Sequence, residues 1–300
     1  MRLLTTGKCN VAIGTNALNS ATTGCYNLAI GQTALGGADT TGINNIAMGS
    51  SAMDALTTGI CNVAIGPAAL GASTTGCNNV AIGITTMDAL TSGCDNIAMG
   101  HNALGASTTG KYNIALGYYS LSGGDTTGDD NIAIGGQNTM DALTTGTDNI
   151  AMGTQALGVS TTGCRNVAIG RYALGEGNTT GINNVAIGVA ALIKLTNGNC
   201  NVAIGPGALG ASTTGSRNIA IGEGSLGVAI VTGADNIALG VAPLDALTSG
   251  SCNIAMGINA LGAATTGGGN IAIGELAMGS GTVTGNLNIH IGKRAGHTAT

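Results

Sequence analysis

The chain alternates apolar and small residues in short segments that recur at a nearly fixed interval. Each segment reads N-φ-A-φ-G, where φ is Val, Ile, Leu or Met, as in Asn10–Gly14; only the last copy differs, with His290 in place of alanine. A period of two places both φ side chains on one face of an extended segment and the alanine on the other. β-Branched residues dominate at φ and favour pleated strands. The pattern predicts a short β-strand in every copy.

These segments belong to a longer internal repeat, T-G-x-x-N-φ-A-φ-G-x-x-A-L followed by a short loop. Of the 16 intervals between successive anchoring asparagines, 10 equal the one from Asn10 to Asn27, and 6 are longer by a single position, like the one from Asn27 to Asn45. No linker or composition shift interrupts the pattern, so residues 1–300 are predicted to form one repeat array without separate domains. The 17 copies are anchored on Asn10, Asn27, Asn45, Asn62, Asn79, Asn96, Asn113, Asn131, Asn149, Asn166, Asn184, Asn201, Asn218, Asn236, Asn253, Asn270 and Asn288.

A period this short leaves no room for two helices and a turn, and it predicts one coil of an all-β solenoid, or β-roll, per copy. The glycine of Thr-Thr-Gly predicts a turn at positive φ. The x-x-A-L segment predicts a second short strand whose leucine, such as Leu18, returns to the core. The extra residues of the longer copies lie outside the N-φ-A-φ-G segment, where insertion leaves the strand register intact.

The loop sequences repeat with a longer period of about three copies, seen at Asp88–Leu90, Gly105–Ser107 and Ser122–Asp125. Three copies per turn of a triangular tube is one interpretation. Asp54 and Gly71 lead directly to Asp88, so one member of the triple is missing there. Because such a deletion would rotate everything after it in a three-copy tube, the sequence favours a history of duplication.

Stacked coils bring the 17 anchoring asparagines above one another, and their amides can exchange hydrogen bonds between coils. This predicts a structural asparagine ladder. The alternative is that asparagine is merely a tolerated turn residue.

Both faces of the predicted strand are apolar, which is unusual for a strand with one side in water. We expect the Val, Ile, Leu and Met side chains to fill the coil with the leucines, while alanine packs on a second surface. The inverse arrangement, with alanine inside a very thin coil, stays open. Either way a long apolar stripe predicts association with further copies. The predicted interface alanines include Ala12, Ala64, Ala133, Ala203 and Ala272.

Composition narrows the functional classes. The chain has 54 Gly, no Trp and no Phe, with 44% hydrophobic and 8% charged residues and a net charge of -5. The acidic balance argues against a nucleic-acid partner, and no apolar run is long enough to insert into a membrane. No recurring carboxylate pair, catalytic triad or phosphate-binding loop stands out, so we expect no enzyme and no cofactor.

Eight cysteines precede anchoring asparagines by one or two residues, and none forms a C-x-x-C motif. Three interpretations are open: free thiols packed as small apolar residues, disulfides across coils or chains (Cys77 and Cys94, for example), or a metal site. Zinc spacing is absent, so no metal is expected.

The segment Asn10–Leu18, N-V-A-I-G-x-x-A-L, and its copies resemble the YadA-like head repeats of trimeric autotransporter adhesins. The T-T-G-x-x-N-x-A-I-G-x-x-A-L form is similar to repeats of phage tail-fibre and virion-fibre proteins. The resemblance spans Thr5 to Ala295 and implies a homotrimeric, left-handed β-roll.

These features predict a structural fibre protein, a rigid solenoid shaft or adhesive fibre of a virion or cell surface. Thr5-Thr6-Gly7 follows Met1–Leu4 at once, so no signal peptide is expected and assembly in the cytoplasm before release is favoured. A host-surface receptor is an expected partner, with Tyr118, Tyr119, Arg171 and Tyr172 as possible contacts.

Two further functions remain open. The repeat enters at Thr5 and leaves at Lys293–Gly296 without an evident cap, and open strand edges recruit further strands. This predicts, as an alternative, a subunit of a head-to-tail extracellular filament. The third interpretation is an ice-binding solenoid, in which the Thr-Thr pairs align on a flat face, although only one threonine of each pair can point outward.

Overall fold

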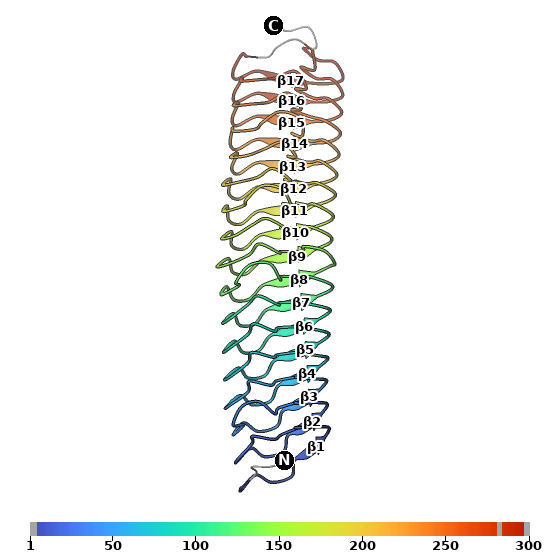
Figure 1. The fold of residues 1–300 in the computed structure, drawn as a ribbon. Helices are drawn as coiled ribbons and strands as arrows, with labels where there is room; N and C mark the ends of the chain where they lie inside the picture. The colour runs from blue at the N-terminus through green and yellow to red at the C-terminus, as the bar shows by residue number, and fades with distance from the viewer. Residues whose placement is uncertain (1–4, 281–283, 297–300) are drawn as a thin grey trace. The chain divides into compact units, whose positions relative to one another are not determined.

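The computed structural model describes residues 5–280 and 284–296, in two compact units, Met1–Asp148 and Asn149–Thr300. Each unit is a parallel β-solenoid in which one sequence copy forms one coil (Figure 1), so the predicted all-β solenoid is confirmed. Residues 1–4, where no signal peptide is expected, lie outside the described ranges. The described residues contain no helix, and therefore none of a length and apolarity that would cross a membrane.

Every strand consists of the three central residues of the repeated segment. In the first unit the strands are β1 (Val11–Ile13), β2 (Leu28–Ile30), β3 (Ile46–Met48), β4 (Val63–Ile65), β5 (Val80–Ile82), β6 (Ile97–Met99), β7 (Ile114–Leu116) and β8 (Ile132–Ile134). In the second unit they are β9 (Ile150–Met152), β10 (Val167–Ile169), β11 (Val185–Ile187), β12 (Val202–Ile204), β13 (Ile219–Ile221), β14 (Ile237–Leu239), β15 (Ile254–Met256), β16 (Ile271–Ile273) and β17 (Ile289–Ile291).

Within each unit, every strand pairs in parallel with the strand of the next coil, in register. Ala12 lies opposite Ala29 in the first unit, and Ala186 lies opposite Ala203 in the second. Because successive copies pair directly, one copy makes one turn, and the interpretation of three copies per turn is wrong. Equivalent residues of neighbouring coils therefore form columns at the strand spacing of about 4.8 Å.

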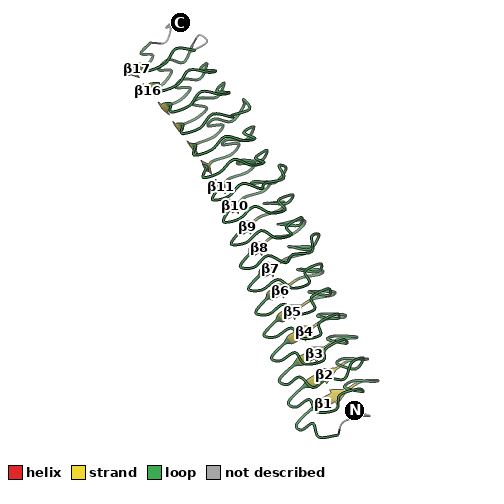
Figure 2. Cartoon of the chain, turned by 90° about the vertical axis from the view of Figure 1, so that its left-hand side faces the viewer, coloured by secondary structure: helices red, strands yellow, loops and turns green. Residues whose placement is uncertain are grey.

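Turns and bends make up the rest of each coil, as Figure 2 shows by the short strands set in long stretches of loop. The second strand predicted at x-x-A-L is wrong. Ala68 and Leu70 both have φ of 52°, in the left-handed region. The N–H of Ala68 donates to the carbonyl of Ser50 in one neighbouring coil, at 2.9 Å, and that of Leu70 to Thr86 in the other, at 3.0 Å. The leucine is nevertheless fully buried, as predicted.

The Thr-Thr-Gly glycine is required for a different reason than expected. Gly76 is not at positive φ, but a Cβ built on it would lie 2.8 Å from the carbonyl oxygen of Gly93 in the next coil. Positive φ occurs instead at the glycine that ends the strand segment, such as Gly83 with φ of 135°. The first glycine thus permits close approach of consecutive coils, and the second one turns the chain.

The interior of the coil holds the alanines, so the favoured orientation of the strand is wrong and the inverse one is observed. Ala64 is fully buried together with Asn62, Ala69 and Leu70, whereas Ile65 is 37% exposed. So short a coil leaves too thin an interior for β-branched side chains on the strand. Of the predicted interface alanines, Ala12 in the first coil is half-buried and the others are sealed inside: Ala64, Ala133, Ala203 and Ala272.

The variant Ala64→Leu tests this orientation. Added methylenes in a packed interior cost about 1–3 kcal/mol, so the urea midpoint of unfolding should fall. Ile65→Leu, which keeps the volume on the outward face of the same strand, is the control and should change stability little. Equal losses for the two variants would contradict an interior lined by alanine.

Candidate functional site

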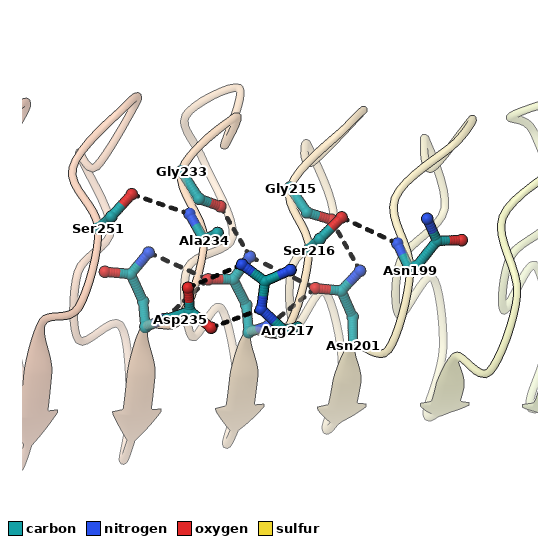
Figure 3. Close-up of polar contacts among 11 residues, drawn as sticks. Asn199, Asn201, Gly215, Ser216, Arg217, Gly233, Ala234, Asp235 and Ser251 are labelled. Carbon is teal, nitrogen blue, oxygen red and sulfur yellow. Dashed lines mark hydrogen bonds and ion pairs between the residues drawn. The ribbon is translucent and has the colours of Figure 1, made fainter.

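The anchoring asparagines form a continuous hydrogen-bonded ladder inside each unit. In the second unit, Oδ1 of Asn201 accepts the backbone N–H of Asn218 at 3.0 Å and its Nδ2–H at 3.3 Å (Figure 3). Nδ2 of Asn201 donates to the carbonyl of Gly215 at 2.8 Å and to Oδ1 of Asn184 at 3.0 Å. One side chain therefore ties its coil to the coils on both sides.

The first unit repeats this arrangement. Oδ1 of Asn62 accepts both the backbone N–H of Asn79, at 3.0 Å, and its Nδ2–H, at 3.1 Å. Nδ2 of Asn62 donates to the carbonyl of Gly76 at 2.8 Å. Asn62 and Asn79 are fully buried, so these bonds satisfy amide groups that water cannot reach. The predicted ladder is present in both units.

A second column lies two residues before each anchoring asparagine, and we call it the cap position. Its backbone N–H often donates to the side chain at the cap position of the next coil. Asn199 N–H donates to Oγ of Ser216 at 3.0 Å, and Ala234 N–H to Oγ of Ser251 at 3.1 Å (Figure 3). Likewise, Oδ1 of Asp129 accepts the backbone N–H of Lys111 at 2.7 Å.

Cysteine is one of these capping side chains. Sγ of Cys25 accepts the N–H of Lys8 at 3.3 Å, and its thiol donates to the carbonyl of Thr23 at 3.4 Å. None of the eight cysteines, which all lie in the described part of the chain, forms a disulfide, and four are exposed and four half-buried. The structure agrees with thiols that form no disulfide, whereas their packing as small apolar residues is wrong, because they are exposed or half-buried. The described residues contain no group of three or more side chains suited to a metal ion.

The outward face of each sheet is a stripe of aliphatic side chains, which we call the outward stripe and define as the φ residues of β1–β8 and of β9–β17. Ile97 and Met99 in the first unit, and Ile221 in the second, are each more than a third exposed. No charged residue occurs at these positions. In several coils the residue after the strand glycine is also apolar and exposed, which widens the stripe: Ile84, Val189, Val241 and Ile258.

Aromatic side chains gather beside the stripe in the first unit. Tyr118 stacks on His101, with ring centroids 5.4 Å apart, and meets the edge of Tyr119 at 4.5 Å. The Tyr118 ring is 53% exposed, so it is open to contact from outside. In the second unit, the Arg171 guanidinium lies 5.5 Å from the ring centre of Tyr172. The four possible receptor contacts thus form two separate pairs, Tyr118–Tyr119 and Arg171–Tyr172.

Charged side chains pair along their columns at the surface. Arg217 reaches Asp235 of the next coil at 2.7 Å (Figure 3), and Lys194 reaches Glu176 at 2.9 Å. The hydrogen bond from Arg217 lowers the pKa of the Asp235 carboxyl group. Exposed pairs of this kind contribute little stability, because water and salt screen them.

The two threonines of each pair have different roles. Oγ1 of Thr57 donates to the carbonyl of Thr74 in the next coil at 2.8 Å, while Thr58 is exposed. The structure therefore presents a single outward rank of threonines, formed by the second residue of each pair.

An acidic residue follows the buried Leu or Met in several coils. Burial raises the pKa of Asp88. Burial also raises the pKa of Asp245, against the opposing effect of a hydrogen bond from the backbone of Val228. Oδ1 of Asp54 and Oδ1 of Asp245 are buried and accept no hydrogen bond from the described residues. At Asp88 and Asp245, burial thus disfavours the ionised carboxylate, because water solvates it poorly.

Sequence reasoning missed the cap position and this acidic position. The first left a signal, because Ser216, Asn199, Asp129 and Cys25 share one place in the repeat and all can accept a hydrogen bond. The acidic position left a weaker signal in the sequence, an aspartate directly after a buried residue. Whether that aspartate is itself buried depends on the width of the coil.

Comparison with protein-family models gives no match, and comparison with curated protein sequences gives none either.

Replacing Asn201 by alanine should break the ladder. The backbone N–H of Asn218 and the carbonyl of Gly215 would be left buried without partners, at about 1–3 kcal/mol each. Summed over the two groups, we expect a loss of about 2–6 kcal/mol in urea unfolding. The control is Asn197→Ala, an exposed asparagine of the same coil whose side chain accepts one 3.5 Å bond, from Thr196. Similar losses in the two variants would show that the ladder does not stabilise the coil.

Asp88→Asn should change the pH dependence of stability. A carboxyl pKa that is raised on folding adds stability below the pKa of the unfolded chain, and this contribution is lost as the pH rises through the folded pKa. The amide does not ionise, so the variant should be more stable than wild type at pH 7 and equal to it near pH 3. Chemical denaturation at both pH values measures this, with exposed Asp130→Asn as control. A gain of the same size at both pH values would refute burial of the charge as the cause.

Proposed function

We propose that this chain is a structural fibre protein whose solenoids assemble with further copies through the outward stripe. The observation that carries the proposal is the stripe itself, an uncharged aliphatic surface on the sheet of each unit. A water-facing sheet normally carries polar side chains. Large contiguous apolar surfaces on soluble proteins mark association sites. A second copy of the same chain supplies an equally long apolar surface with the same coil spacing.

The interior supports a mechanical role. The recurring buried polar side chains, the asparagines, donate and accept between neighbouring coils, so they lock the coil register. Each coil is also tied to the next by strand pairing and by backbone bonds from the left-handed positions, such as Leu70 N–H to Thr86. A solenoid whose register is fixed at every coil suits a shaft that transmits force, and we assign it no catalytic role.

The number of copies comes from the resemblance to trimeric fibre repeats, which favours a homotrimer with the stripes facing a common axis. The aromatic group at His101, Tyr118 and Tyr119 borders the stripe, and it is the surface we favour for contact with a host receptor. Location on a virion or as an extracellular fibre, after assembly in the cytoplasm, belongs to the same proposal.

Sedimentation of the full chain tests the assembly. The variant Ile221→Asp places a charge on the outward stripe, where Ile221 is 39% exposed. Val159→Asp is the matched control, because Val159 is 40% exposed on the same unit but outside the stripe. We expect wild type and Val159→Asp to sediment as trimers, and Ile221→Asp to dissociate at concentrations where they do not.

Three outcomes distinguish the alternatives. A wild-type chain that stays monomeric at all concentrations would contradict assembly through the stripe. Growth without limit would select the head-to-tail filament, and electron micrographs would then show uniform threads. Equal dissociation of both variants would mean that a charge acts through stability and not through the stripe.

A further inference from the structure

Cys77 and Cys94 occupy the cap position in consecutive coils, those of β5 and β6. No other two of the eight cysteines share a column in neighbouring coils. The backbone N–H of Cys77 donates to Sγ of Cys94 at 3.3 Å, and the thiol of Cys94 donates to the carbonyl of Ser92 at 3.6 Å. Both cysteines are half-buried, so small reagents in solution can reach them.

We propose that Cys77 and Cys94 are a redox modification site, which forms a disulfide between the two coils when the protein meets a small-molecule disulfide such as oxidised glutathione. Column neighbours in a parallel solenoid are about 4.8 Å apart, within the range of about 4.4–6.8 Å that Cα atoms of a disulfide span. Sγ of Cys94 already lies 3.3 Å from the backbone nitrogen of Cys77, so bond formation needs only a local side-chain movement.

The reaction is an exchange of two thiols for one disulfide. The interaction with Cys94 and burial raise the pKa of Cys77 to about 11, which disfavours the Cys77 thiolate. We therefore assign Cys94 as the first nucleophile of the exchange. Its thiolate bonds to one sulfur of oxidised glutathione, and the other sulfur leaves as glutathione thiolate. Cys77 then loses its proton and attacks Sγ of Cys94, which expels the second glutathione. Two cysteines are oxidised, and one glutathione disulfide is reduced to two glutathione molecules.

The disulfide would be a covalent cross-link between neighbouring coils of the asparagine ladder. It adds a second covalent link between two consecutive coils, which the backbone connects once per turn and hydrogen bonds hold in register, and it closes a loop of chain between positions 77 and 94. Such a loop closure disfavours the unfolded chain. The solenoid would assemble with free thiols in a reducing compartment and become covalently linked in an oxidising one.

Cleavage before aspartate tests the link directly. In this chain it releases residues 54–87, with Cys61 and Cys77, and residues 88–94, with Cys94. Folded full-length protein is incubated with oxidised glutathione, its free thiols are alkylated, and the digest is analysed by mass spectrometry without reductant. We expect the two fragments to be joined, and to separate when dithiothreitol is added.

Three variants identify the sulfur atoms. The joined product should persist in Cys61→Ser and be lost in Cys77→Ser and Cys94→Ser. Separate fragments from oxidised wild-type protein would overturn the proposal, and so would a joined product that depends on Cys61 instead of Cys77. The wild-type digest decides the first point even if a variant fails to fold.

Discussion

Hydrogen bonds between one coil and the next are the constraint on which the rest of this structure depends. A three-residue strand has few backbone groups to pair, and so short a coil encloses too little apolar volume to hold itself. The asparagine amide supplies further hydrogen bonds between coils, because a single buried side chain binds its coil to the coils on both sides. These bonds matter to stability because they are buried away from water. Losing one partner leaves the other polar group desolvated and without a hydrogen bond, which costs free energy. The glycine columns follow from this constraint, because any Cβ there would keep neighbouring coils apart.

The same constraint settles which side chains face outward. Coils held this closely have room for alanine opposite leucine, with the asparagine beside them, and no room for a row of isoleucines. The aliphatic residues of the strand are therefore displaced to the surface. There they favour strand formation through cross-strand contact with other aliphatic side chains and leave an apolar stripe to be covered. The thin interior of the coil thus has two consequences. It brings the coils close enough for the stabilising hydrogen bonds, and it leaves the aliphatic side chains outside, where they favour association.

Much of this fold follows from the sequence, because period and alternation are robust signals. The interval between copies predicts one coil per copy, and the invariant asparagines predict the ladder. Alternation shows which residues share a face but not which face is enclosed, because both faces are apolar. That choice depends on the left-handed backbone at Ala68 and Leu70 and their equivalents, which narrows the coil. Nothing in alanine or leucine signals this conformation, which costs about 1–2 kcal/mol per residue in isolation. It persists because burial and bonds to both neighbouring coils hold it.

The in-register columns have an evolutionary corollary. Each coil meets only the coils next to it and presents the same residues to each, so a unit can be duplicated or lost without remodelling what remains. The missing member of the loop triple between Asp54 and Asp88 is what the loss of one unit would leave, and the coils on either side of it pair in register. Recombination can therefore lengthen or shorten this protein by whole coils, while the cross-section of each coil stays the same.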